Sequence, residues 1–149
     1  MMEGNQAELF AERQKGMLPG ELALEWAVVE NGRAEGRFTV AKRHMAPNGF
    51  LHAASIVALV DTACGYACLA SVPDGASGFT TIELKTNYLG TAQEGETVSC
   101  TARLLHGGRM TQVWDAEAVN ETTGKTIALF RCTQILLYAD RTTSPESRQ

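Results

Sequence analysis

Cysteine and basic side chains are scarce in this chain of 149 residues, and each scarcity argues against a class of function. Its four cysteines form no CxxC pair and no Cys/His cluster with the spacing of a zinc site, so we expect no metal. Lysine and arginine number 13 against 17 acidic residues, and the formal net charge is −4. This balance argues against a nucleic-acid partner, which would favour a basic face.

The N-terminal residues lack the apolar run of a signal peptide, because acidic, basic and amide side chains are mixed throughout residues 1–16. Four cysteines without a disulfide pattern fit a reducing compartment. We therefore expect a cytoplasmic protein whose cysteines are small, buried, apolar side chains.

Charge is almost absent from one long segment, where Asp61 is the only charged side chain between Arg43 and Asp74. Residues 53–72 are long enough to cross a membrane. An acid near the centre of a membrane span costs about 2.5–3.5 kcal/mol on insertion scales, however. A helix that protein buries on most sides explains the same composition, so we expect no membrane contact. A carboxylate in such surroundings is a candidate for a functional site.

Strand patterns surround this helix, which is predicted over about residues Ala53 to Ser71. A short amphipathic helix is predicted at 6–15, and Asn31-Gly32 predicts a hairpin between two strands in residues 22–40. Four further strands are predicted at 79–89, 96–106, 110–120 and 126–138. The pattern predicts one α+β domain over residues 1–139, with about six antiparallel strands wrapped around one helix. Residues 1–19 are its helical extension, and residues 140–149 are a polar tail that we expect to be disordered.

The start of the long helix and Asp61 form a candidate acyl-transfer site. The first N–H groups of a helix have no internal partner and can bind a developing oxyanion. His52 and Ala53 begin the helix, and Asp61 follows nine residues after His52. At 1.5 Å per residue the two positions are about 13 Å apart, too far to touch one carbonyl. If both act, a two-fold dimer must bring the donor of one chain to Asp61 of the other.

The segment NGFLHAASIVALVDTACGYA resembles the motif of the hotdog-fold acyl-CoA thioesterases of the 4-hydroxybenzoyl-CoA and PaaI-like type. The family pattern is a glycine, two residues, His-Gly-Gly and an acid nine residues after the histidine. The segments TTIELKTNYLGTAQEGETV and GGRMTQVWDAEAVNETTGKTIA are similar to the family's later strands. The resemblance covers about residues 20–138. It implies a hotdog fold and an acyl-CoA thioesterase that acts as a homodimer, or as a dimer of dimers, with active sites at the interface.

The resemblance also implies a role for each matched residue. Asp61 matches the catalytic acid, either a general base for water or a nucleophile that forms a mixed anhydride. Ala53 matches the residue whose N–H polarises the thioester carbonyl, and His52 matches a positioning histidine. Thr81 matches a hydroxyl that orients the attacking water in some members. Coenzyme A arrives as part of the substrate, so no cofactor is expected.

Substrate contacts are implied at Gly49, Gly65, Lys85, Gly108, Arg109 and Met110. Among them, Arg109 matches a segment that contacts the CoA arm, and Lys85 is a candidate for a CoA phosphate. A medium-chain or aromatic acyl group is expected for a pocket that Val57, Leu59 or Tyr66 would line.

Two departures from the family pattern leave alternatives open. Ala46 stands where the family often has Asn or Gln, and Asn48, two residues later, is a candidate replacement in the site. Ala53 replaces the first glycine of His-Gly-Gly but keeps its N–H. A non-catalytic acyl-CoA binding or sensor protein is one alternative, supported by Ala46. A hotdog hydratase or dehydratase, in which His52 and Asp61 of different chains act together, is the other.

Overall fold

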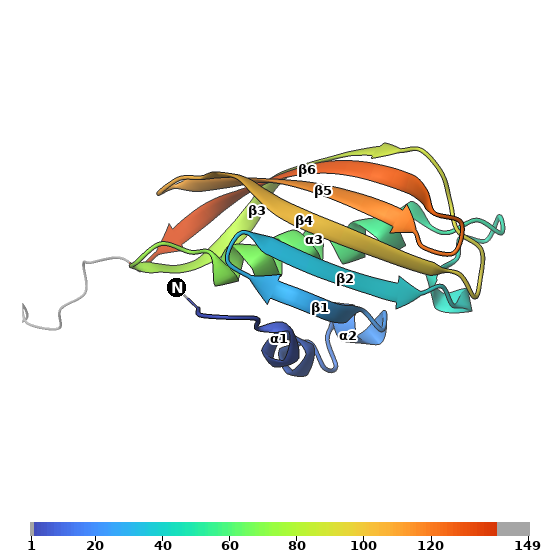
Figure 1. Cartoon of the computed structure of the whole chain (residues 1–149), viewed down its shortest axis with the longest axis horizontal. Helices are drawn as coiled ribbons and strands as arrows, with labels where there is room; N and C mark the ends of the chain where they lie inside the picture. The colour runs from blue at the N-terminus through green and yellow to red at the C-terminus, as the bar shows by residue number, and fades with distance from the viewer. Residues whose placement is uncertain (1, 140–149) are drawn as a thin grey trace, which may run out of the picture.

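A six-stranded antiparallel sheet wraps around one long helix in the computed structural model, which describes residues 2–139 (Figure 1). The strand order is β1-β2-β4-β5-β6-β3. The strands are β1 (Glu25–Glu30), β2 (Arg33–Thr39), β3 (Ala76–Tyr88), β4 (Thr97–Gly107), β5 (Thr111–Asn120) and β6 (Lys125–Tyr138). The predicted α+β hotdog fold is confirmed, whereas the expected tail at 140–149 lies outside the described residues.

The long helix α3 (Ala53–Ala70) is the core of the fold. Ile56, Leu59 and Val60 are buried against the concave face of the sheet. The helix is long and apolar enough to span a membrane by length and composition, but 56% of its residues are buried inside the protein. This is the environment of a core helix, as the sequence predicted.

Ser71 ends α3 and joins it to the first hairpin. Its hydroxyl donates to the Ala67 carbonyl at 2.6 Å and accepts the Gly32 N–H at 2.8 Å. Because Gly32 is the turn residue between β1 and β2, this contact fixes that turn against the end of the helix.

Two short helices, α1 (Ala7–Arg13) and α2 (Leu18–Glu21), precede the sheet beside β1 (Figure 1). Gln14 follows α1 and is buried: its amide donates to the Leu24 carbonyl at 2.7 Å. The side-chain oxygen of Gln14, Oε1, accepts the Trp26 indole N–H at 2.8 Å and the Tyr66 hydroxyl at 3.2 Å. The predicted helix at 6–15 is therefore present in shorter form. The sequence did not predict two further elements. They are α2, which has Pro19 in its first turn, and η1, the 3-10 turn Lys42–His44.

The two edges of the sheet differ. The outer edge of β1 is covered by the N-terminal segment, since Gln6 N–H donates to the Val29 carbonyl at 2.7 Å and the Asn5 amide donates to the Ala27 carbonyl at 2.8 Å. β3 forms the other edge, and no strand of residues 2–139 pairs with its outer side. Ile82 on that edge strand is 56% exposed. An open edge with an exposed apolar side chain favours pairing with another strand.

Candidate active site

Asp61 lies at the middle of α3, half-buried, and faces β3. The Thr81 hydroxyl on β3 donates to its Oδ1 at 3.1 Å. None of the ion pairs in the described part of the chain includes Asp61. The carboxylate is therefore oriented by a neutral hydroxyl and not neutralised by a cation, which suits a base or a nucleophile.

The start of α3 keeps one backbone donor available. His52 caps the helix, because its Nδ1 accepts the Ala54 N–H at 2.9 Å and its carbonyl accepts the Ser55 N–H at 2.9 Å. The Ala53 N–H has no acceptor among residues 2–139, and Ala53 is exposed. The donor that the sequence singled out is thus the free one in this turn.

Asn48 closes its own turn in the loop before α3. Its side-chain oxygen accepts the Phe50 N–H at 3.2 Å, and the Ala46 N–H donates to the Phe50 carbonyl at 2.7 Å. Gly49 has a φ of +86°, which a glycine adopts without strain. Both residues are exposed at the helix-start end of the molecule. Their predicted roles toward the substrate remain predictions.

Gly65 has a packing reason for lacking a side chain. It lies on α3 one turn after Asp61 and is buried. A Cβ at this position would come 2.8 Å from Cζ of Phe79 on β3. The substrate contact predicted for Gly65 therefore competes with a simpler explanation, close approach of the helix to an aromatic ring.

The turn between β4 and β5 carries Gly108, Arg109 and Met110, and it lies at the other end of α3. The Leu136 N–H donates to the Met110 carbonyl at 2.8 Å, and the Tyr138 hydroxyl donates to the Arg109 carbonyl. Next along β5, the Gln112 amide donates to the carbonyl of Ser71, the residue that ends α3, at 3.0 Å. Within one chain, this turn and the start of α3 are therefore separated by the full length of the helix.

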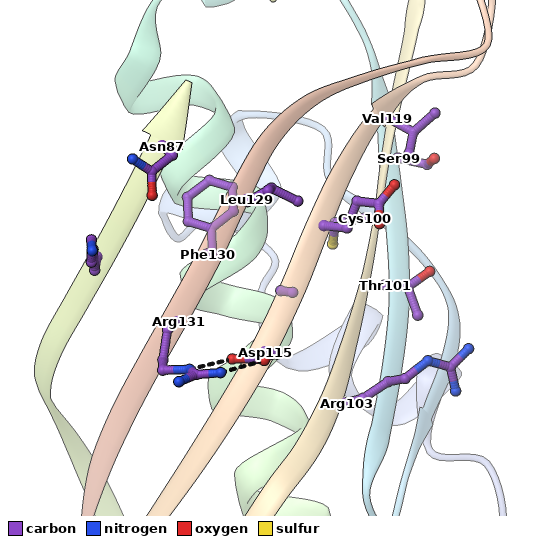
Figure 2. Close-up of a pocket in the computed structure, with 13 residues that line it drawn as sticks. Asn87, Ser99, Cys100, Thr101, Arg103, Asp115, Val119, Leu129, Phe130 and Arg131 are labelled. Carbon is purple, nitrogen blue, oxygen red and sulfur yellow. Dashed lines mark hydrogen bonds and ion pairs between the residues drawn. The ribbon is translucent and has the colours of Figure 1, made fainter. Parts of the chain in front are cut away.

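An open groove of about 680 Å³ lies on the outer face of the sheet, and neither Asp61 nor Thr81 lines it (Figure 2). Lys85 contributes to its wall from β3 and Arg103 from β4. Arg131 and Asp115 form a two-bond ion pair in its floor, with N–O distances of 2.6 and 2.7 Å. The fold thus places Lys85 on the opposite face of the sheet from Asp61.

Two buried amides on the inward face were not singled out from the sequence. Gln112 on β5 and Gln134 on β6 are directly paired and at most 1% exposed. Gln112 uses both ends of its amide, since its Oε1 also accepts the Trp114 indole N–H at 3.1 Å. The sequence signal was available: each is a polar residue at an inward position of an alternating strand.

Comparison with known proteins gives a consistent result. The model of the Thioesterase superfamily matches residues 48–127. The 1,4-dihydroxy-2-naphthoyl-CoA hydrolase of Listeria monocytogenes is 31% identical over 112 residues, which are 75% of this chain and 89% of that protein. The acyl-coenzyme A thioesterase PaaI of Escherichia coli is 31% identical over 110 residues, 74% of this chain and 75% of that protein.

Solved structures agree with the fold. The structure of the E. coli PaaI protein has a TM-score of 0.77 and 26% identity, and the match covers 87% of this chain and 90% of that one. A mutant thioesterase from Pseudomonas aeruginosa has a TM-score of 0.85 and 24% identity over 92% of this chain and 97% of that one. With a matching family model over more than half of its length, and relatives that hydrolyse acyl-CoA, the chain belongs to the thioesterase superfamily and is an acyl-CoA thioesterase.

Proposed function

We propose that this enzyme hydrolyses a medium-chain or aromatic acyl-CoA to the free acid and CoA, with Asp61 as the general base or nucleophile. The observation that carries the assignment of Asp61 is its environment: the carboxylate lies at mid-helix, has no cation partner among residues 2–139 and accepts the Thr81 hydroxyl at 3.1 Å. As a general base, Asp61 takes a proton from water while the water oxygen bonds to the thioester carbon. As a nucleophile, its oxygen forms a mixed anhydride that water then cleaves.

The Ala53 N–H would polarise the thioester carbonyl. It is the unpaired donor of the first turn of α3, and the helix dipole adds positive potential at the same place. As the carbon–sulfur bond breaks, the CoA sulfur leaves and takes a proton to become a thiol. His52, which caps the same turn, holds the backbone of this donor in place.

Two chains are needed to bring these groups together. Ala53 and Asp61 are eight positions apart on one continuous helix, which is about 12 Å along its axis. In the single chain the outer edge of β3 is open, and the face of α3 that carries Ala54, Ala58 and Asp61 is partly exposed. An isologous dimer through these surfaces would place Ala53 of one protomer beside Asp61 of its partner, twice. The Arg109 turn and the Asn48 loop, at opposite ends of one α3, would likewise meet across the two-fold axis.

The acyl group is the finer part of the proposal. One relative is named for an aromatic substrate, 1,4-dihydroxy-2-naphthoyl-CoA, and PaaI belongs to a phenylacetic acid degradation operon. Both support an aromatic acyl group here. Val57, half-buried one turn before Asp61 on α3, offers an apolar contact of that kind. The expected contacts from Leu59 and Tyr66 are not supported, because Leu59 is fully buried in the core and Tyr66 packs against Phe10 and Trp26 beside β1.

Release of free thiol from a panel of acyl-CoAs tests the proposal: short, medium and long chains, phenylacetyl, benzoyl and hydroxybenzoyl. We expect selective hydrolysis by the wild type and a loss of about 10²-fold or more in kcat for Asp61→Asn, the usual range for an acid–base residue. Asp74→Asn is the matched control, because Asp74 is an exposed acid beyond the end of α3. Full activity of Asp61→Asn would contradict the role of this residue. Tight binding without turnover would favour the acyl-CoA sensor instead.

A further inference from the structure

Gln134 on β6 has an unused hydrogen-bonding position inside the protein. Its side chain is 0% exposed, and its Nε2 donates only to the Cys132 sulfur, at 3.5 Å. Its Oε1 has no hydrogen-bond partner in the part of the chain that the structure describes. A buried carbonyl oxygen without a donor destabilises the fold, and folded proteins keep few of them. The Gln134 Oε1 can therefore accept a hydrogen bond from a nearby hydroxyl that rotates toward it.

Such a donor lies directly across the sheet. Gln134 is paired with Thr81 in the β3–β6 ladder. Paired residues project from the same face with Cβ atoms about 4.5–5.5 Å apart. Rotation about the side-chain bonds of Gln134 can therefore bring its amide to the Thr81 hydroxyl. That hydroxyl has one hydrogen, which it now donates to Asp61 at 3.1 Å. It can serve Asp61 or Gln134, but not both.

We propose that Gln134 is a positioning residue that accepts the Thr81 hydroxyl when Asp61 becomes protonated during turnover. The inference rests on the proposed function, and specifically on the general-base route. While Asp61 is ionised, it holds the hydroxyl, because a hydrogen bond to an ionised acceptor is roughly twice as strong as a neutral one. Once Asp61 is neutral this advantage disappears, and the unpaired Gln134 Oε1 becomes the better acceptor.

In the first step a water O–H bond breaks and its proton forms an O–H bond on Asp61. The hydroxide oxygen bonds to the thioester carbon while the π electrons of the carbonyl move to its oxygen. The new Asp61 O–H donates to the Thr81 oxygen, and the Thr81 O–H, which is never broken, turns to Gln134. In the second step the oxyanion re-forms the C=O bond and the carbon–sulfur bond breaks. Asp61 then returns its proton to the leaving sulfur, and the Thr81 hydroxyl turns back.

Among residues 2–139, the ionisable group in hydrogen-bond contact with Gln134 is the Cys132 thiol on β6, which in turn interacts with Cys64 on α3. A hydrogen bond with Cys132, together with burial, raises the pKa of Cys64 well above its usual range. Cys64 therefore stays neutral at the pH of an ordinary assay. Asp61 is the group on α3 whose change of charge can move the Thr81 hydroxyl.

A double-mutant cycle on kcat tests the inference with Thr81→Val, Gln134→Met and the double variant. Methionine has a similar shape to glutamine without the amide. We expect Gln134→Met to lower kcat by about three- to tenfold, the rate equivalent of one neutral hydrogen bond, with KM unchanged. Because Gln134 acts through the Thr81 hydroxyl, the double variant should be no slower than Thr81→Val alone. Multiplying losses, or a change confined to KM, would overturn the proposal.

Gln112→Met is the matched control, since Gln112 is the adjacent buried amide and both of its ends are already bonded. It should lower the unfolding temperature and show no dependence on Thr81 in kcat. Gln134→Met, which removes an unpaired acceptor, should not lower the unfolding temperature. A fall as large as that of Gln112→Met would mean that Gln134 has only a structural role.

A second measurement decides the geometry without using activity. In an Asp61→Ala background the Thr81 hydroxyl loses its charged acceptor and should turn to Gln134 permanently. Thr81→Val and Gln134→Met should then be non-additive in unfolding temperature, whereas with Asp61 present they should add. A crystal structure of Asp61→Ala should place Thr81 Oγ1 and Gln134 Oε1 about 2.7–2.8 Å apart. If no thioester is hydrolysed the proposed function fails, and this cycle still decides whether the hydroxyl can turn. Additivity in both backgrounds would overturn the relay.

Discussion

Two aspartates of this enzyme have opposite surroundings, and the contrast distinguishes the proposed catalytic carboxylate from one held in an ion pair. Asp61 accepts a neutral hydroxyl and has no ion-pair partner among residues 2–139. Asp115, on the outer face of the sheet, accepts two hydrogen bonds from Arg131 (Figure 2). The Arg131 guanidinium holds the pKa of Asp115 below its usual value. A carboxylate tied to a cation in this way is a poor base, whereas Asp61 keeps its lone pairs available.

The lowered pKa of Asp115 predicts a contribution to acid stability. A carboxylate with a lower pKa in the folded state stabilises the fold above its unfolded pKa of about 3.9, and the contribution is lost as pH falls through the folded pKa. Asp115→Asn should therefore flatten the fall in unfolding free energy between about pH 5 and pH 2. The pair is largely exposed, so the difference should be below about 1 kcal/mol. Urea unfolding across that range measures it, with Asp74→Asn as the unpaired control. Parallel curves for Asp115→Asn and wild type would contradict the prediction.

At the scale of single elements, local pattern predicted much of the fold. The helix expected from Ala53 to Ser71 ends at Ala70, and the four later strands lie within three residues of their predicted bounds. Asn31-Gly32 forms the predicted hairpin turn, with Gly32 at a φ of +80°. These successes share a cause, since hydrophobic periodicity and turn residues are local signals.

The order of strands in the sheet and the hydrogen-bond partners of buried side chains depend on contacts between distant residues. Local sequence patterns therefore could not predict them. β3 follows α3 in the chain but pairs only with β6, so its Thr81 meets Gln134, 53 positions away. The unpaired Oε1 of Gln134 exists only in that arrangement. The groove on the outer face of the sheet likewise depends on side chains from four strands. The sequence alone therefore does not tell on which face of the sheet Lys85 lies, and its predicted CoA contact did not take that face into account. The motif around Asp61 was recoverable because its spacing lies within one helix and the turn before it.

The fit of α3 against β3 predicts the effect of a single methyl group. In an exposed helix, Gly→Ala stabilises by about 1 kcal/mol. At Gly65 the new Cβ would be 2.8 Å from the Phe79 ring, and overpacking typically costs about 1–3 kcal/mol. We expect Gly65→Ala to lower the unfolding free energy by about 1 kcal/mol, measured by urea unfolding at fixed protein concentration. In a Phe79→Leu background, which removes the ring, the same substitution should become neutral or stabilising. A stabilised Gly65→Ala protein would show that the helix moves away easily.

At the scale of the whole molecule, one of the two sheet edges in residues 2–139 is open to a partner strand. The N-terminal segment covers the β1 edge through Asn5 and Gln6. At the other side of the sheet β3 has an open outer edge (Figure 1) and packs against α3, whose face around Asp61 is partly exposed. Both surfaces border Asp61. These surfaces are the basis of the proposed dimer, in which neither chain would hold a whole site.

This arrangement predicts complementation between two inactive variants. Asp61→Asn removes the acid. Ala53→Pro removes the backbone donor with little disturbance, because proline is well tolerated at the first position of a helix and Ala53 N–H has no acceptor to lose. His52, with ψ of 132°, already has the extended backbone that precedes a proline. Each homodimer should be inactive or nearly so by thiol release. A heterodimer, purified through two different tags, should regain about half of the wild-type kcat.

The reason is geometric. In the heterodimer, the intact Ala53 of the Asp61→Asn chain faces the intact Asp61 of the Ala53→Pro chain, so one of the two sites is complete. If each site were built within one chain, neither chain of the heterodimer would have a whole site and activity would stay absent. A matched pair that carries both substitutions on one chain and none on the other separates the cases further. That heterodimer has no complete site if sites form across the dimer, and one complete site if they form within a chain. The two heterodimers must therefore give opposite results, and equal activity in both would rule out this division of the site between chains.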